Sequence, residues 1–196
     1  MKLYTTENKL LYVSDSETDT VKQAVEQAVV DEMNLLYINL EGVDLSGAQL
    51  SGARMPYARL INANCTDTNF TNATLDYANC TDTNFTNTTL DYANCTCTIF
   101  TNATLEDTNC IGTNFTKTIL VNASCKGAHF KSAKFINANC TGSDFTKSKI
   151  LDTYCKDCDF TNAQFTDAYI LGSYFPCCIN PPANSTSSQT VPQEVS

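Results

Sequence analysis

The chain has 196 residues, 42% of them hydrophobic, and carries a formal net charge of −9 with a single histidine. This size and hydrophobic content predict one domain with a well-filled core. The negative charge argues against nucleic acid and anionic membranes as direct partners, because both are bound through Lys and Arg. The N-terminus shows no long apolar stretch, so we expect no signal peptide, no membrane span and synthesis in the cytoplasm, where the eleven cysteines stay reduced.

Residues 1–37 differ in pattern from the rest of the chain. The run "KLYTTENKLLYVS" predicts two short strands around a polar turn, and "TVKQAVEQAVVDEMN" places Val21, Val25 and Val29 on one face of a helix over about 20–33. Thr20 and Gln23 match a capping box, which marks the start of that helix. We expect this segment to form a small β-hairpin and helix cap, because the first coil of a solenoid needs cover.

A five-residue period runs through residues 38–178. Every fifth residue from Leu40 to Phe175 is Leu, Ile, Met, Phe or Cys, and all ten phenylalanines lie at these positions. The residue that lies two positions before each of these large residues is small, except before Leu40 and Leu45. Neither the helical period of 3.6 nor the strand period of 2 produces such a pattern. Stacked coils of short extended segments and turns do, so the sequence predicts an all-β solenoid.

The runs "VDLSGAQLSGARM" (43–55) and "YARLINANCTDTNF" (57–70) resemble the pentapeptide-repeat proteins, whose motif reads roughly A-(D/N)-L-X-X. The resemblance covers about residues 38–178. It implies a right-handed, four-sided parallel β-helix with about four pentapeptides per coil, and hence about seven coils here. The sequence departs from the motif by placing Cys at every third central position and Thr at many of the small positions.

Seven cysteines recur at 15-residue steps within this region. If residues 20 apart stack, none of these cysteines lies directly on another, and each shares its coil with Leu and Phe side chains. Because interiors penalise both voids and overfilling, we interpret these thiols as small core residues rather than as a metal or redox array. The seven are Cys65, Cys80, Cys95, Cys110, Cys125, Cys140 and Cys155.

Four cysteines lie outside this series. Cys97 is predicted to point outward and has no assigned role. Cys158 and Cys178 are 20 apart in the sequence at equivalent small positions, so adjacent coils should bring them within disulfide range. With Cys155 and Cys177 nearby, these two also make a candidate zinc set of four, although the spacing matches no standard zinc motif. Free thiols are the first interpretation, with a disulfide or a metal site as alternatives.

The C-terminal end of the solenoid is predicted to be open and apolar. Its last coil offers Phe160, Phe165, Ile170 and Phe175, and no amphipathic helix follows. Residues 179–196 form a tail that is either flexible or held by a partner. Such an end favours association with the tail, with a second copy or with another protein.

No pairing of a nucleophile with a base is visible, and the single histidine, His129, lies at an outward position, so we expect neither an enzyme nor a cofactor. Residues 61–116 contain no Lys or Arg, whereas 117–156 are rich in Lys. The first hypothesis is a structural, protein-interaction rod in a larger or multi-copy assembly, such as a virus or phage particle. The family resemblance implies a second, an acidic DNA mimic that binds type II topoisomerase (gyrase). The third is a metal or small-ligand binder at the C-terminal cysteines.

Overall fold

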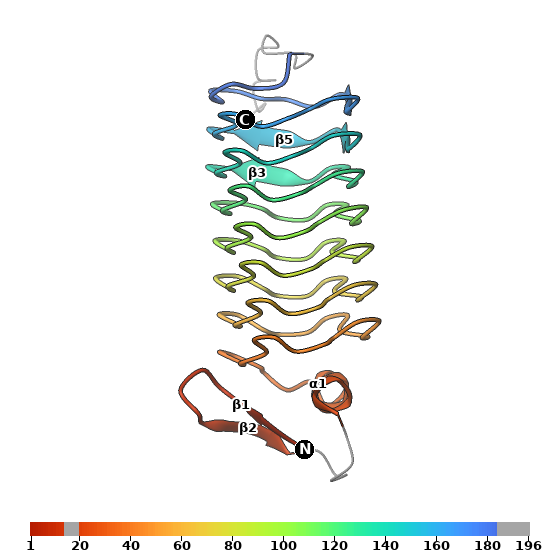
Figure 1. Cartoon of the computed structure of the whole chain (residues 1–196), viewed down its shortest axis with the longest axis vertical. Coiled ribbons are helices and arrows are strands. Elements are labelled where there is room, and N and C mark those ends of the chain that lie inside the picture. The colour runs from red at the N-terminus through yellow and green to blue at the C-terminus, as the bar shows by residue number, and fades with distance from the viewer. Residues whose placement is uncertain (14–19, 184–196) are drawn as a thin grey trace, which may run out of the picture.

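The computed structural model describes residues 1–13 and 20–183, which form a tall stack of coils with a hairpin and a helix at its N-terminal end (Figure 1). The antiparallel strands β1 and β2 make the hairpin, and the helix α1 leads into the coils. The bounds are β1 Lys2–Tyr4, β2 Leu10–Val13, α1 Val21–Val30, β3 Lys134–Ile136, β4 Lys149–Leu151, β5 Tyr154–Lys156 and β6 Tyr169–Leu171.

Each coil consists of four pentapeptides, as the family resemblance implies. Parallel bridges join positions 20 apart along the stack, from the pair Asn34 and Arg54 to the pair Asp159 and Ile179. In the C-terminal half, β3 pairs with β5 and β4 with β6 in the same register. The first bridged residue of this parallel series is Asn34, so the coils begin slightly before the predicted boundary at residue 38.

The interior is filled by the side chains of the five-residue series. From Leu35 to Phe160 these side chains are at most 4% exposed, and the seven regularly spaced cysteines are at most 2% exposed. Phenylalanines three pentapeptides apart in the sequence meet edge to face across a quarter turn, as Phe85 and Phe100 do with ring centroids 5.5 Å apart. Rings, thiols and branched chains therefore rotate around the axis, which confirms the predicted cysteine-rich core.

The corners of the coils are tight turns with one left-handed residue. At the first corners, the N–H of Ala48 donates to the carbonyl of Leu45 over 2.9 Å, and Gly47 between them has φ +69°. A positive φ at the third residue of a turn is typical of type II and favours Gly, Asn or Asp. Asn and Asp occupy this position more often than Gly does, as Asn72 does with φ +59°.

The helix begins as predicted and ends earlier. Thr20 and Gln23 form the capping box, but α1 stops at Val30 rather than near residue 33. The chain reverses because Glu32 adopts φ +54°, and the N–H of Met33 donates back to the carbonyl of Ala28 over 2.9 Å. This Schellman arrangement satisfies the last carbonyls of the helix.

The hairpin is joined to the first coil by backbone hydrogen bonds. The N–H of Asn39 donates to the carbonyl of Tyr4 over 3.0 Å, and the N–H of Thr6 donates to the carbonyl of Tyr37 over 2.9 Å. Leu3 on β1 and Val25 on α1 are buried. The N-terminal segment therefore buries apolar side chains of its own at that end of the stack.

Candidate interaction surfaces

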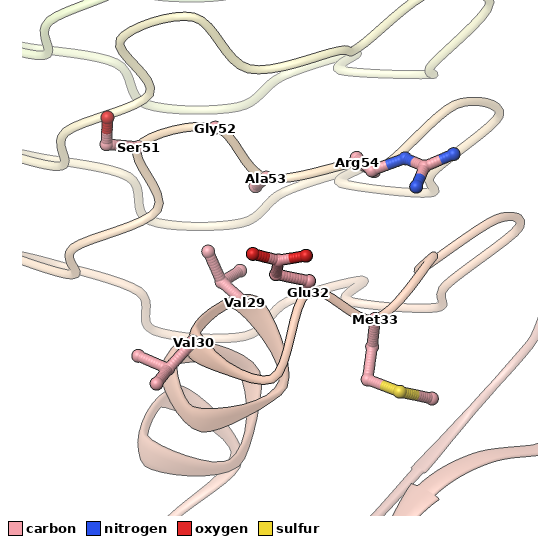
Figure 2. A pocket seen from close by; sticks show the side chains of 8 residues that line it. All are labelled: Val29, Val30, Glu32, Met33, Ser51, Gly52, Ala53 and Arg54. Atoms are coloured by element: carbon pink, nitrogen blue, oxygen red, sulfur yellow. The ribbon is translucent and has the colours of Figure 1, made fainter.

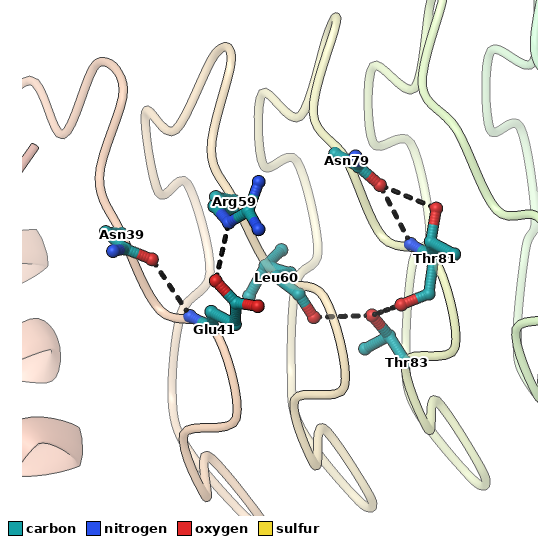
Figure 3. Close-up of polar contacts among 7 residues, drawn as sticks. All are labelled: Asn39, Glu41, Arg59, Leu60, Asn79, Thr81 and Thr83. Atoms are coloured by element: carbon teal, nitrogen blue, oxygen red, sulfur yellow. Dashed lines mark hydrogen bonds and ion pairs between the residues drawn. The ribbon is translucent and has the colours of Figure 1, made fainter. Parts of the chain in front are cut away.

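A ladder of hydroxyl groups lines the inside of the coils, and the sequence analysis did not predict it. Wherever Thr replaces Ala at the small position, its hydroxyl donates to a carbonyl of the preceding coil, as Thr83 does to Leu60 over 2.6 Å (Figure 3). The same bond is made by Thr68, Thr88, Thr98, Thr108, Thr113, Thr118, Ser143, Thr153 and Ser173.

These carbonyls have a free lone pair because the turn N–H occupies only one of the two. Leu60, for example, accepts from the N–H of Ala63 and from the hydroxyl of Thr83. A buried hydroxyl is thus satisfied without disturbing the turn, which explains why Thr can replace Ala at this position. The alternation of Ala and Thr along the series was the signal that could have revealed this bond.

Asparagine side chains cap the outer turns. The Oδ1 atom of Asn79 accepts from the N–H of Thr81 over 3.1 Å and from its hydroxyl over 2.7 Å (Figure 3). Asn64 and Thr66 make the same pair of bonds. Local turn geometry therefore accounts for the Asn-x-Thr triplets in which the Asn directly precedes an inward residue, such as Asn79-Cys80-Thr81.

Cys158 and Cys178 occupy the same place in the coil as the ladder hydroxyls. The thiol of Cys158 donates to the carbonyl of Phe135 over 3.3 Å and that of Cys178 to the carbonyl of Cys155 over 3.1 Å. The neighbouring Cys178 side chain, followed by burial, raises the pKa of Cys158 well above its ordinary value. Both are free thiols in this structure, and their oxidation to a disulfide stays a prediction.

The four candidate metal ligands do not converge on one point. Cys155 faces the core at 2% exposure, whereas Cys177 lies exposed on an outer turn with φ +56°. Within residues 1–13 and 20–183, no three His, Cys, Asp or Glu side chains come together in a way that could hold a metal ion. Of the four, the described geometry brings together the pair Cys158 and Cys178.

The C-terminal end is less open than the sequence predicts. Phe160 and Phe175 are buried at 3% and 2% exposure, so two of the four side chains that the sequence places at this end are covered. The reason is that Phe175 packs edge to face on Phe160 with ring centroids 5.9 Å apart, and the chain continues to Ile179, which pairs with Asp159. Phe165 and Ile170 remain partly exposed. Residues 184–196, most of the predicted tail, lie outside the described part of the chain.

Three hollows of the described surface are shallow and lie on the outside of the coils. One, of about 420 Å³, separates the end of α1 from residues 51–54 and is lined by Val29, Val30 and Glu32 among others (Figure 2). Another, of about 440 Å³, lies between the hairpin and Tyr37. We name the first of these the α1 cleft.

A third hollow, of about 490 Å³, contains the single histidine. His129 lies there with Lys147 and Lys149, and its pKa is lowered by burial and then by the charge of Lys149. Lys126 at its rim forms an ion pair with Asp144 over 3.5 Å. The outward position predicted for His129 is therefore correct, and the hollow around it contains the acidic residues Glu106 and Asp107 as well as the lysines.

Exposed tyrosines form a short stack on one corner. The rings of Tyr57 and Tyr77 lie parallel at 4.8 Å, and Tyr37 continues the row at 4.9 Å from Tyr57. Cys97 occupies the next position of this column, and its contact raises the pKa of the Tyr77 hydroxyl. The stack presents ring edges and hydroxyl groups to solvent, because the ring faces cover one another.

A solid four-sided stack of pentapeptides, with shallow outer hollows and exposed aromatic side chains, defines the class as a β-solenoid repeat protein. The family model for pentapeptide repeats matches in eight copies, which together cover residues 27–175. The chain belongs to the pentapeptide-repeat family.

Solved structures agree on the fold. HetL, a pentapeptide-repeat protein involved in heterocyst differentiation regulation in the cyanobacterium Nostoc sp. strain PCC 7120, is similar at TM-score 0.66 and 20% identity. The match covers 70% of this chain and 63% of HetL, so this chain spans less than two thirds of that relative. Trypsin-treated QnrB1, a plasmid-mediated fluoroquinolone resistance protein, is similar at TM-score 0.51 and 20% identity, over 69% of this chain and 75% of QnrB1.

No curated protein matches the chain. Across the described residues, no helix could cross a membrane, since none combines the necessary length with an apolar sequence.

Proposed function

We propose that this protein is a non-enzymatic interaction rod that binds other proteins through its outer surface as a component of a larger or multi-copy assembly. The rod is taken to be right-handed, as the family resemblance implies, with the hairpin and α1 as its N-terminal cap. A virus or phage particle is one such assembly.

The observation that supports this proposal most directly is the filled interior. Inward side chains from Leu35 to Phe160 are almost fully buried, which leaves no room for a substrate inside the coils. Enzymes usually bind substrates in concave, largely apolar pockets. The hollows described above are open, and none joins a nucleophile to a base within hydrogen-bond reach.

The outer surface has the features of a protein-binding surface. Tyr77, Tyr92 and Leu171 are 50%, 64% and 60% exposed. Tyrosine is enriched in protein interfaces, and large exposed side chains that gather on one surface favour a partner. The turns and coils beneath them are held by backbone hydrogen bonds, so the surface is presented in a fixed shape.

The test is photocrosslinking in cells that express the chain naturally. A benzophenone amino acid placed at exposed Tyr77 or Tyr169 should yield crosslinks to defined proteins, and native extracts should contain the chain in particles much larger than itself. Thr161, a small polar residue on a corner that carries neither of these tyrosines, provides the control position. A chain that migrates alone and crosslinks to nothing from either tyrosine position would refute the proposal.

The second candidate is a DNA mimic that binds a type II topoisomerase. Its support is the acidic segment 61–116 and a fold shared with QnrB1, a fluoroquinolone resistance protein. Against it, exposed cations follow directly, among them Lys131, Lys134 and Lys149. Those charges interrupt an otherwise acidic surface, so we rank this function below the interaction rod.

A supercoiling assay with purified gyrase separates the two candidates. A DNA mimic should inhibit supercoiling or relieve fluoroquinolone inhibition at micromolar protein. Replacing Asp76, Asp82 and Asp91 by asparagine should then abolish the effect, because the acidic side chains stand in for phosphates. No change in supercoiling at a large excess of the native chain would remove this candidate.

A further inference from the structure

We propose that one corner of the rod is a self-complementary surface that pairs two copies of this chain side by side in opposite directions. The inference concerns purified chain alone and does not rest on the proposed function, whose partners are other proteins. We name this surface the Tyr92 corner. It consists of Asp91, Tyr92, Ile111, Lys131, Leu151 and Leu171, with the α1 cleft at its N-terminal end.

These residues lie along one continuous corner, where Asp91, Ile111, Lys131, Leu151 and Leu171 stack in a column and Tyr92 follows Asp91. The N–H of Tyr92 donates to the carbonyl of Ile111 over 2.8 Å, and equivalent bonds join the following corners up to Leu171. Leu151 and Leu171 are directly paired on β4 and β6. Towards the N-terminus the same corner passes through Gly52, which lines the α1 cleft.

The most exposed large apolar side chains of the described chain gather on this corner. Val30 is 74% exposed, Tyr92 64% and Leu171 60%, and these are the three highest values among the large hydrophobic residues that the structure describes. Val30 lines the α1 cleft at one end, and Leu171 projects from the other end. The cleft also has polar lining residues, among them Glu32 and Ser51, but Val29 and Val30 give Leu171 of a second copy apolar side chains to pack against.

The spacing fits a two-fold axis. Ser51, in the α1 cleft, lies three coils before Ile111 in this column, and Leu171 lies three coils after Ile111. An axis at Ile111 therefore places Leu171 of each copy over the α1 cleft of the other. Both contacts form at once, as an isologous interface requires.

The charges select the antiparallel direction. Asp91 and Lys131 lie one coil before and one coil after Ile111 in the same column. In an antiparallel pair each Asp91 faces Lys131 of the second copy, whereas a parallel pair would place like charges together. The second oxygen of Asp91 is available for this contact, because the first accepts from the N–H of Ile111 over 2.8 Å.

Sedimentation equilibrium of the full chain under reducing conditions tests the pairing. We expect a reversible dimer. Leu171→Asp should raise the dissociation constant of this dimer about 100-fold, because Leu171 of each copy makes one contact and each contact contributes about tenfold. Ile119→Asp is the matched control, since Ile119 is also exposed but lies on another face, and its dimer should be unchanged. A chain that stays monomeric up to about 100 µM overturns the proposal.

Charge exchange tests the direction. Lys131→Asp should weaken the dimer, and adding Asp91→Lys to the same chain should restore it, because the exchanged pair again faces across the axis. Circular dichroism confirms that each variant is folded. If the double variant is as weak as the single one, the antiparallel register is wrong.

Photocrosslinking from position 171 identifies the surface that it contacts. The proposal predicts crosslinks between copies to residues 29–33 or 51–54. Crosslinks to residues 165–179 of the second copy would instead show end-to-end association and overturn this pairing. Neither result affects the proposed binding of other proteins, because that binding is tested by crosslinking in cells and by the particle size in native extracts.

Discussion

Two kinds of buried cysteine in this chain should respond differently to the same change, replacement by serine. The sulfur of Cys110 is fully buried among apolar side chains and has no hydrogen-bond partner in the described structure. Cys158 is also buried, but its thiol donates to the carbonyl of Phe135 over 3.3 Å. Serine therefore leaves a hydroxyl unsatisfied at position 110 and finds an acceptor at 158.

The change in the free energy of unfolding depends on whether the new hydroxyl finds a hydrogen-bond partner. An unsatisfied buried hydroxyl costs about 1–3 kcal/mol, so Cys110→Ser should lower the free energy of unfolding by that amount. Cys158→Ser should change it by less than about 0.5 kcal/mol, within the range of a neutral substitution. Ser143 and Ser173 show that serine reaches the equivalent carbonyl, at 2.9 and 2.8 Å.

Urea unfolding under reducing conditions, followed by circular dichroism, measures both values by linear extrapolation. Cys110→Ala is the matched control, because it removes the sulfur without adding a hydroxyl. Similar free energies for the two serine variants would refute the reasoning, and so would a Cys110→Ser protein that is more stable than Cys110→Ala.

Four further outcomes are expected. Phe100→Ala should lower the free energy of unfolding in urea by about 3–5 kcal/mol, since its ring is fully buried. Ser148→Ala should raise it by about 1 kcal/mol, because the buried Ser148 hydroxyl has no partner among the described residues. Thiol titration of the native protein should label Cys97 and Cys177 first and reach the core thiols after unfolding. Hydrogen bonds from Thr161 lower the pKa of Asp159 below 3.8; the resulting stability is present above that pH and lost as pH falls below it, which acid titration by circular dichroism measures.

Much of the fold could be predicted because its rule is local. A large residue at every fifth position, such as Phe70 or Leu75, must point inward wherever the chain turns after each short extended segment. That pattern predicted the solenoid, the buried cysteines and the outward side of His129, all of which the structure confirms. The start of α1 could be predicted because the capping box of Thr20 and Gln23 lies within four residues of sequence. The end of α1 could not, because it depends on a left-handed Glu32, and helices usually end at a left-handed Gly rather than at Glu.

Which side chains are neighbours on the surface depends on the 20-residue coil, because the coil brings together residues that are distant in the sequence. Thr83 meets the carbonyl of Leu60, and Leu171 shares a corner with Tyr92, only because the coils stack in that register. The sequence by itself determined which side chains are inside, since burial follows the five-residue period. The tertiary structure alone decided which outer side chains are neighbours, because a 15-residue repeat wound on a 20-residue coil rotates every motif to a different face.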